Sequence, residues 1–310
     1  MSRNKTTANP ENHRHSAARP PLSLSYEFFP PRQPNQQRRF WRTVGCLETL
    51  QPTFFSVTYG ALGSASEASL GIVSELINES ETPVAAHLTC GGQTPDQVAL
   101  ILDRLEALGI RHIVALRGDR TEPGETVSGG GQPMRYATDL LHLLQQRPAA
   151  RRVAEISVAA YPEIHPEAAN ATADLDNLKR KFDAGATRAL TQYFYDCDAF
   201  LRFRDMAVAA GISNPIVPGL LPVHDIDKVV DFSARCGAKV PESLIARFRP
   251  LGNDTAAKFK AATEHGLGMC DRLISEGVTD FHFYTLNQSD LAYEISKELI
   301  GISVPESSAA

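Results

Sequence analysis

The stretch Val84–Gly118 reads VAAHLTCGGQTPDQVALILDRLEALGIRHIVALRG, and it decides the fold class. Its two ends are short, nearly continuous apolar runs, which are typical of strands covered on both faces. Between them, Thr94 and Gln97 form a capping-box pattern around Pro95, and Gly109 supplies a helix stop. A strand, a helix and a second strand in this order predict a β-α-β unit with parallel strands.

The same alternation recurs along the chain. Apolar runs with strand character lie at Leu22–Phe29, Phe54–Tyr59, Val84–Cys90, His112–Gly118, Glu155–Pro162, Ala189–Tyr195, Ile216–Pro222 and Asp280–Asn287. Helix-period stretches fill the gaps, and the gap between the last two runs is long enough for two helices. Repeated units of this kind build either an open doubly wound sheet or a closed barrel. Eight units in 310 residues favour a single-domain (β/α)8 TIM barrel of the α/β class.

Both ends of the chain differ in composition from the barrel region. Residues 1–21 are polar and lack the apolar segment of a secretory signal, so we expect a disordered tail. A transit peptide stays open, because Glu11 is the only acidic residue of this segment. The barrel is expected to span residues 22–302, and residues 303–310 are expected to be frayed.

Composition argues against several classes of protein. The net charge is −5, with both signs interspersed, which disfavours a protein that binds nucleic acid or an anionic membrane. No apolar run is long enough to cross a bilayer. The five cysteines lie far apart without a CxxC pair, so we expect neither a disulfide framework nor a metal site, and a cytoplasmic location.

A group of residues, all polar except one glycine, gathers at the predicted carboxyl ends of the strands, where barrel enzymes hold their active sites. They are Glu27, Thr58, His87, Arg117, Gly118, Asp119, Tyr161, His165 and Gln192. Any one of them alone could be a satisfied buried polar group. Their convergence on one end of the barrel indicates a functional site there.

Glu27 is the strongest candidate, because it lies inside an apolar strand. Burial favours the protonated carboxyl, which could act as a general acid. The alternative is a structural carboxylate paired with a cation such as Arg32. At another strand end, Arg117 could bind phosphate, while Gly118 allows close approach of the backbone.

Helical spacing places Asp174, Asn177 and Lys181 on one face after the fifth strand. Such spacing is typical of a solvated face, but contacts to ribose and phosphate stay open. The run Gly129–Gly131 does not match the fingerprint G-x-G-x-x-G, so a dinucleotide would have to be held by barrel loops.

Together these segments resemble the methylenetetrahydrofolate reductase family, in the short form that consists of the catalytic barrel. The motifs that carry the resemblance are Tyr26–Arg32, Ser56–Ala61, Ala86–Cys90, Arg111–Asp119, Ser157–Pro166, Thr191–Phe194 and Asp280–Asn287. They occur in order between about residue 22 and residue 300.

The resemblance implies a flavin enzyme with a ping-pong mechanism that supplies methyl groups for methionine synthesis. NADH, the more usual donor in bacterial short forms, or NADPH would pass hydride to FAD. The substrate 5,10-methylenetetrahydrofolate would then enter and be reduced to 5-methyltetrahydrofolate. A homo-oligomer is also expected. The alternatives are a flavin-binding barrel without folate turnover and a flavin-free lyase or hydrolase that uses Glu27 and Asp119 as an acid–base pair.

The resemblance also assigns roles to residues. Glu27 matches the general acid, and Asp119 matches a carboxylate beside flavin and pterin that would stabilise a cationic iminium. Gln192 matches an amide that contacts pterin and nicotinamide, and Thr58 matches a nicotinamide contact. The residues that match FAD-binding positions are Tyr59, Ala61, His87, Arg117, Gly118, Asp119, Ala137, Tyr161, His165, Ala168, Asp174, Asn177, Arg180 and Lys181.

Two positions depart from the pattern of bacterial relatives. Lys228 stands where they carry a glutamine, and Gln288 stands where they carry an arginine. Both positions point toward the aminobenzoyl-glutamate end of the folate in the family. We therefore expect the binding of that end to be rearranged, while the reaction at the pterin is unaffected.

Overall fold

The computed structural model describes residues 21–59, 64–118, 132–148 and 153–301, and for residues 64–66 it describes the backbone alone. Nearly all of the predicted tail 1–21, the tail 303–310 and the Gly129–Gly131 run therefore lie outside the described residues. The same holds for the predicted site residues Ala61 and Asp119.

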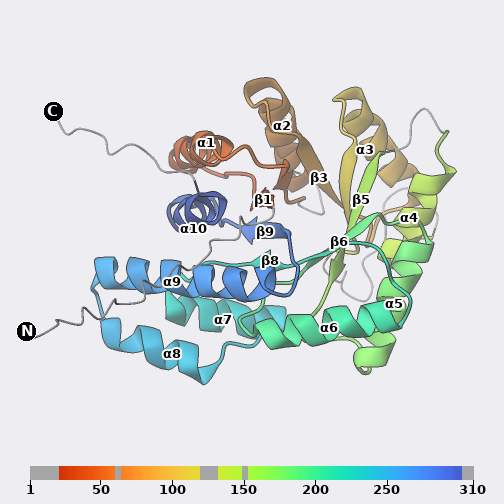
Figure 1. The fold of residues 1–310 in the computed structure, drawn as a ribbon. Helices are drawn as coiled ribbons and strands as arrows, with labels where there is room; N and C mark the ends of the chain where they lie inside the picture. The colour runs from red at the N-terminus through yellow and green to blue at the C-terminus, as the bar shows by residue number, and fades with distance from the viewer. Residues whose placement is uncertain (1–20, 60–63, 119–131, 149–152, 302–310) are drawn as a thin grey trace, which may run out of the picture.

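Within the described residues, parallel strands form one sheet that curls into a nearly closed barrel, with helices around its outer face (Figure 1). The strands are β1 (Ser23–Phe28), β2 (Phe54–Val57), β3 (Val84–Thr89), β4 (His112–Leu116), β5 (Glu155–Ala160), β6 (Arg188–Thr191), β7 (Ile216–Val217), β8 (Gly219–Leu220) and β9 (Asp280–Tyr284). Their order in the sheet is β7-β6-β5-β4-β3-β2-β1-β9-β8, so nearly every strand lies beside its neighbour in sequence. The predicted (β/α)8 class is confirmed.

The helices alternate with the strands as predicted. They are α1 (Pro34–Glu48), α2 (Ser64–Glu79), α3 (Pro95–Ala107), α4 (Ala137–Gln146), α5 (Ala171–Asp183), α6 (Cys197–Ala209), α7 (Ile226–Cys236), α8 (Glu242–Phe248), α9 (Thr255–Ile274) and α10 (Asp290–Ile300). None of these helices, in the part of the chain that the structure describes, is long and apolar enough to span a bilayer.

The seventh predicted strand differs from the expectation, because it is broken at Pro218 into β7 and β8. Proline has no N–H to donate to a neighbouring strand. The first half pairs with β6 and the second half with β9, so the chain changes partner at the break. The Pro218 carbonyl accepts from the His282 N–H at 3.0 Å. This change of partner brings the two ends of the sheet together.

The segment before the last strand, which the sequence showed to be long enough for two helices, holds three. Gly237 adopts a left-handed conformation with φ +75° and ends α7. Pro241 then precedes a short α8, and Asp254 caps the N-terminus of α9. These signals end one helix and begin the next, so three helices fit before β9.

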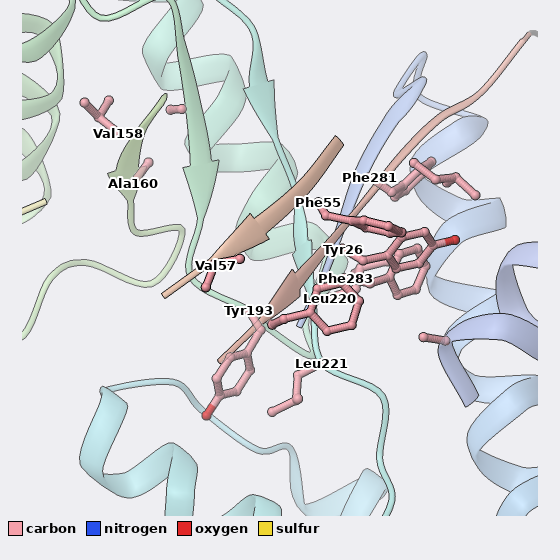
Figure 2. Close-up of a cluster of buried hydrophobic side chains, with 14 of the residues drawn as sticks. Tyr26, Phe55, Val57, Val158, Ala160, Tyr193, Leu220, Leu221, Phe281 and Phe283 are labelled. Atoms are coloured by element: carbon pink, nitrogen blue, oxygen red, sulfur yellow. The ribbon is translucent and has the colours of Figure 1, made fainter. Parts of the chain in front are cut away.

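Side chains of each strand alternate between the barrel interior and the layer beneath the helices. On β1, Tyr26 packs in the outer layer, where its ring stacks on Phe283 of β9 with 5.7 Å between centroids (Figure 2). The neighbouring Ser25 and Glu27 face the interior, where they meet His282. The alternation along β1 therefore decides that Glu27, and not Tyr26, faces the barrel interior.

The helix start predicted at Thr94 is confirmed. The Gln97 N–H donates to Thr94 Oγ1 at 3.3 Å, and the Thr94 N–H donates to Gln97 Oε1 at 2.9 Å. We expect Thr94→Ala to lower the free energy of unfolding by about 1 kcal/mol, because a backbone N–H of the first turn loses its acceptor. Thr94→Ser, which keeps the hydroxyl, should unfold at nearly the wild-type urea concentration. Equal urea midpoints for the alanine variant and the wild type would contradict a stabilising cap.

Candidate active site

A cleft of about 440 Å³ opens at the carboxyl ends of the barrel strands. The residues predicted from the sequence that line it are Glu27, Thr58, Tyr59, His87, Gly118, Tyr161 and Gln192. Its other lining residues are Phe28, Phe29, Thr89, Val114, Leu116, Ala159, Leu190, Tyr193, Leu221, Phe232, Cys236, Tyr284 and Leu286. The structure thus brings together residues from all eight of the predicted strand regions.

The carboxyl group of Glu27 lies between two histidines. Its Oε2 is 3.4 Å from Nε2 of His87 on β3 and 3.7 Å from Nε2 of His282 on β9. Both histidines are buried, whereas the Glu27 side chain is 20% exposed toward the cleft. The alternative partner Arg32 is wrong, since the ion pairs of Glu27 within the described residues are with these imidazoles. Glu27 is therefore open to a ligand.

The two imidazoles present ring nitrogens to Glu27 that have no other partner in the described part of the chain. Burial lowers the pKa of His87, and the Glu27 carboxylate opposes that shift only in part. His87 is therefore neutral near pH 7. Ser25 Oγ donates to the Phe281 carbonyl at 3.3 Å and lies 2.8 Å from Nδ1 of His282. The contact with Ser25 on the Nδ1 side leaves Nε2 of His282 facing Glu27.

A second group of predicted residues surrounds Tyr161 at one side of the cleft. The ring of His165 packs edge-on against Tyr161 at 4.5 Å, and the His165 N–H donates to Asp174 Oδ2 at 2.8 Å. Lys181 reaches the cleft wall, where its Nζ donates to the Ala159 carbonyl at 2.9 Å. Burial lowers the pKa of Lys181 to about 8, against the attraction of Asp174. A partly buried cation next to an open cleft suits an anionic ligand.

The remaining predicted residues lie around this group. The Ala168 N–H donates to the His165 carbonyl at 2.9 Å, and Ala137 is buried at the start of α4. On α5, Arg180 is exposed and contacts Asn177 at 3.5 Å. Arg117 forms a two-point ion pair with Glu167, at 2.7 and 3.1 Å, so a phosphate there would have to share or displace that carboxylate.

Known proteins that are similar to this chain share one family name. The family model described as methylenetetrahydrofolate reductase matches residues 13–300. The chain belongs to the methylenetetrahydrofolate reductase family. It is 42% identical over 280 residues to the 5,10-methylenetetrahydrofolate reductase of Escherichia coli K12, covering 90% of each chain. The enzyme of that name from Pectobacterium carotovorum is 42% identical over 278 residues, again with 90% of each chain covered.

A solved structure shows the same fold at low identity. It is an uncharacterized protein from Clostridium thermocellum that binds two copies of 5-methyl-5,6,7,8-tetrahydrofolic acid. The two folds superimpose with a TM-score of 0.61 over 92% of this chain and 97% of that chain. At 14% identity, this likeness speaks for the fold alone.

Several residues of the cleft in this family member were not singled out from the sequence. Phe29 and Leu286 expose 39% and 40% of their surface at its rim. Phe232 stacks on Tyr193 with 5.9 Å between ring centroids and an interplanar angle of 12°. The available signal was position, because Phe29 and Leu286 lie within two residues of a strand end at the carboxyl end of the barrel. His282 shares the inward face of β9 with Tyr284, a pairing that period-2 alternation could have indicated.

The cleft fits a planar cofactor with phosphate groups, such as a flavin dinucleotide. Gly118 has φ +85°, and a side chain there would collide with Thr89, so the backbone closely approaches the cleft floor. Thr89 Oγ1 is buried without a partner in the described residues, and so can meet a polar ring atom. A further cavity of about 290 Å³ shares Tyr161 with the cleft and is lined by Asp174. A planar ring system in the cleft could contact the Gly118 backbone and the Thr89 hydroxyl. Its ribose and phosphates could then extend toward Asp174 and Lys181.

Proposed function

We propose that the chain reduces 5,10-methylenetetrahydrofolate to 5-methyltetrahydrofolate with FAD and a reduced nicotinamide. The observation that carries the proposal is the carboxyl of Glu27, which faces the cleft from β1 between two imidazoles. It is supported by 42% identity to a bacterial 5,10-methylenetetrahydrofolate reductase over 280 residues. The proposed donor is NADH, as in most bacterial short forms, and a homo-oligomer belongs to the same proposal.

The cofactor would be held by the residues around Tyr161 and Gly118. Bound FAD supplies the ability to take up a hydride and pass it on. Lys181 and Arg117 offer cations to its phosphates, and Asp174 offers an acceptor to a ribose hydroxyl. Tyr59, His87 and Thr89 would line the ring system, while Ala61 and Asp119 are proposed contacts by family resemblance.

Glu27 would supply the proton for the folate. It would donate its proton to the amine nitrogen of the five-membered ring, whose C–N bond then opens to give a cationic iminium. The neutral imidazole of His87 would lie beside the Glu27 proton without adding a positive charge near the iminium. Asp119 and Gln192 are the proposed partners of the pterin, through negative charge and amide hydrogen bonds respectively.

Anaerobic spectroscopy of the two half-reactions tests this function. The purified protein should show a flavin spectrum that NADH bleaches and that 5,10-methylenetetrahydrofolate restores, with 5-methyltetrahydrofolate as the product. A colourless protein would favour the flavin-free lyase or hydrolase. Bleaching by NADH without formation of 5-methyltetrahydrofolate would favour a flavin-binding barrel without folate turnover.

The lowered pKa of Lys181 predicts how FAD binding depends on pH. The ammonium form attracts phosphate, and in the cofactor-free protein it is lost as the pH rises through about 8. Bound phosphate raises that pKa, so affinity should be constant at lower pH and fall by up to about tenfold per pH unit above 8. Fluorescence titration of the cofactor-free protein with FAD between about pH 6.5 and 9.5 measures this effect.

A matched pair of variants tests the assignment of this pH dependence. Lys181→Met should bind FAD more weakly and lose the decline above pH 8. Lys179→Met removes an exposed cation of the same helix and should retain the decline. The same decline in both variants would mean that another group titrates.

A further inference from the structure

A second depression, of about 520 Å³, lies on the outside of the barrel between α1 and the start of α10. Its walls include Arg38, Arg39 and Arg42 of α1, together with Thr43, Ser289 and Asp290. Figure 1 shows α1 and α10 side by side, and both begin at the end of the barrel where the cleft opens. We call this feature the arginine depression.

The three arginines of the depression are exposed and have no acidic partner within the described residues. Some other arginines among the described residues are paired with acids: Arg147 contacts Asp103 and Glu106, and Arg272 contacts Asp198 and Glu276. Asp290 is the one acidic residue among the described lining residues. Three like charges around one hollow repel one another, and an anion in the hollow would relieve that repulsion.

One short loop separates the arginine depression from the cleft. Leu286 lines the cleft and Ser289 lines the depression, so their Cα atoms are no more than about 11 Å apart. Both Leu286 and Asn287 adopt positive φ, at +48° and +54°, which is unfavourable for residues other than glycine. The loop is therefore held in a specific shape at the boundary between the two hollows.

Asn287 forms hydrogen bonds with residues of both the cleft and the arginine depression. Its side chain donates to the Phe29 carbonyl at 2.8 Å and accepts from the Phe29 N–H at 3.1 Å, which fixes the rim of the cleft. Its own carbonyl accepts from Thr43 Oγ1 at 3.2 Å, which fixes a wall of the depression. A ligand that leaves the cleft past Phe29 and Leu286 would thus meet the arginines of α1.

We propose that the arginine depression binds the carboxylates of the glutamate tail of a folate whose pterin lies in the cleft. This proposal rests on the proposed function, which brings the folate to the cleft. Each glutamate linked through its γ-carboxyl adds one carboxylate to the tail, and three guanidinium groups can receive several of them. Folates with longer tails would therefore bind more tightly.

The test compares 5,10-methylenetetrahydrofolate that carries one glutamate with the form that carries five. In the wild type, the longer form should have a KM on the order of tenfold lower, since exposed ion pairs each contribute little. The triple variant Arg38→Gln, Arg39→Gln, Arg42→Gln should reduce this preference to about twofold or less, with kcat nearly unchanged. Rising ionic strength should weaken the preference in the wild type only.

A control variant removes three other cations and the same total charge. Arg111→Gln, Lys179→Gln, Lys297→Gln changes residues that the structure places outside both hollows, and it should keep the wild-type preference. Equal preference in the arginine triple variant and the wild type would overturn the proposal. Loss of affinity for NADPH in the arginine triple variant, with the tail preference unchanged, would also overturn the proposal, because the depression would then bind a nucleotide phosphate.

Equilibrium dialysis with 5-methyltetrahydrofolate of either tail length separates this proposal from the proposed function. One outcome is that the protein binds the longer form more tightly through the arginines and yet turns over neither folate. In that case the proposed function is wrong, and the proposal that the arginine depression binds the tail is retained. If turnover proceeds and tail length has no effect, the depression proposal fails alone.

Discussion

Glu27→Gln is expected to slow the reduction of 5,10-methylenetetrahydrofolate by on the order of 10²–10⁴-fold, the usual contribution of a general acid. The amide has the shape of the carboxyl but cannot give a proton to the folate nitrogen. Transfer of hydride from the nicotinamide to the flavin needs no such proton, so that half-reaction should proceed at nearly the wild-type rate. Anaerobic stopped-flow spectroscopy measures the two rates separately.

The structure offers a matched control at the opposite end of the barrel. Glu155 begins β5, and its Oε2 lies 3.9 Å from Nδ1 of His112 and 3.1 Å from Arg188. Glu155→Gln also alters a carboxyl next to a buried histidine, but away from the cleft, and should leave both half-reactions within about twofold. An equal loss of both half-reactions in Glu27→Gln would show that Glu27 maintains the site rather than protonating the folate.

The sequence predicted the parts of the fold that depend on local patterns. The capping signals of Thr94 and the apolar runs of the strands are short-range features, and they identified α3 and the eight strand regions. The break at Pro218 was missed because an apolar run continues across it. What decides the break is pairing with β6 and β9, which come from distant parts of the chain.

The candidate site, like the fold, was predicted only where a local sequence pattern indicates it. Glu27 was conspicuous as a charge inside an apolar strand, and the structure confirms that it faces the cleft. Its neighbours His87 and His282 are 60 and 255 residues away in sequence, so the contacts exist only because β1 lies near β3 and beside β9. The arginine depression was not predicted from the sequence for a similar reason, since it requires the packing of α1 against α10.

The closure of the barrel depends on a position without a side chain. Gly219 begins β8, directly after the break at Pro218, and its N–H donates to Thr191 Oγ1 at 2.9 Å. The Tyr284 hydroxyl donates to the Thr191 carbonyl at 2.7 Å, so the ends of β6 and β9 meet beside this glycine. A Cβ on Gly219 would overlap with the Thr191 carbonyl oxygen and the Tyr284 ring. Only glycine lets the strands approach this closely.

Gly219→Ala should therefore lower the free energy of unfolding by about 3 kcal/mol or more, at the upper end of overpacking effects. The carbonyl of Thr191 is part of the sheet and cannot move aside as the end of a flexible side chain can. Gly268→Ala is the matched control, since a Cβ there meets nothing within 4 Å in the middle of α9. It should raise stability by about 0.5–1 kcal/mol, because alanine replaces glycine inside a helix. Chemical denaturation of both variants measures the difference, and a Gly219→Ala protein as stable as the wild type would mean that the sheet closes without this close approach.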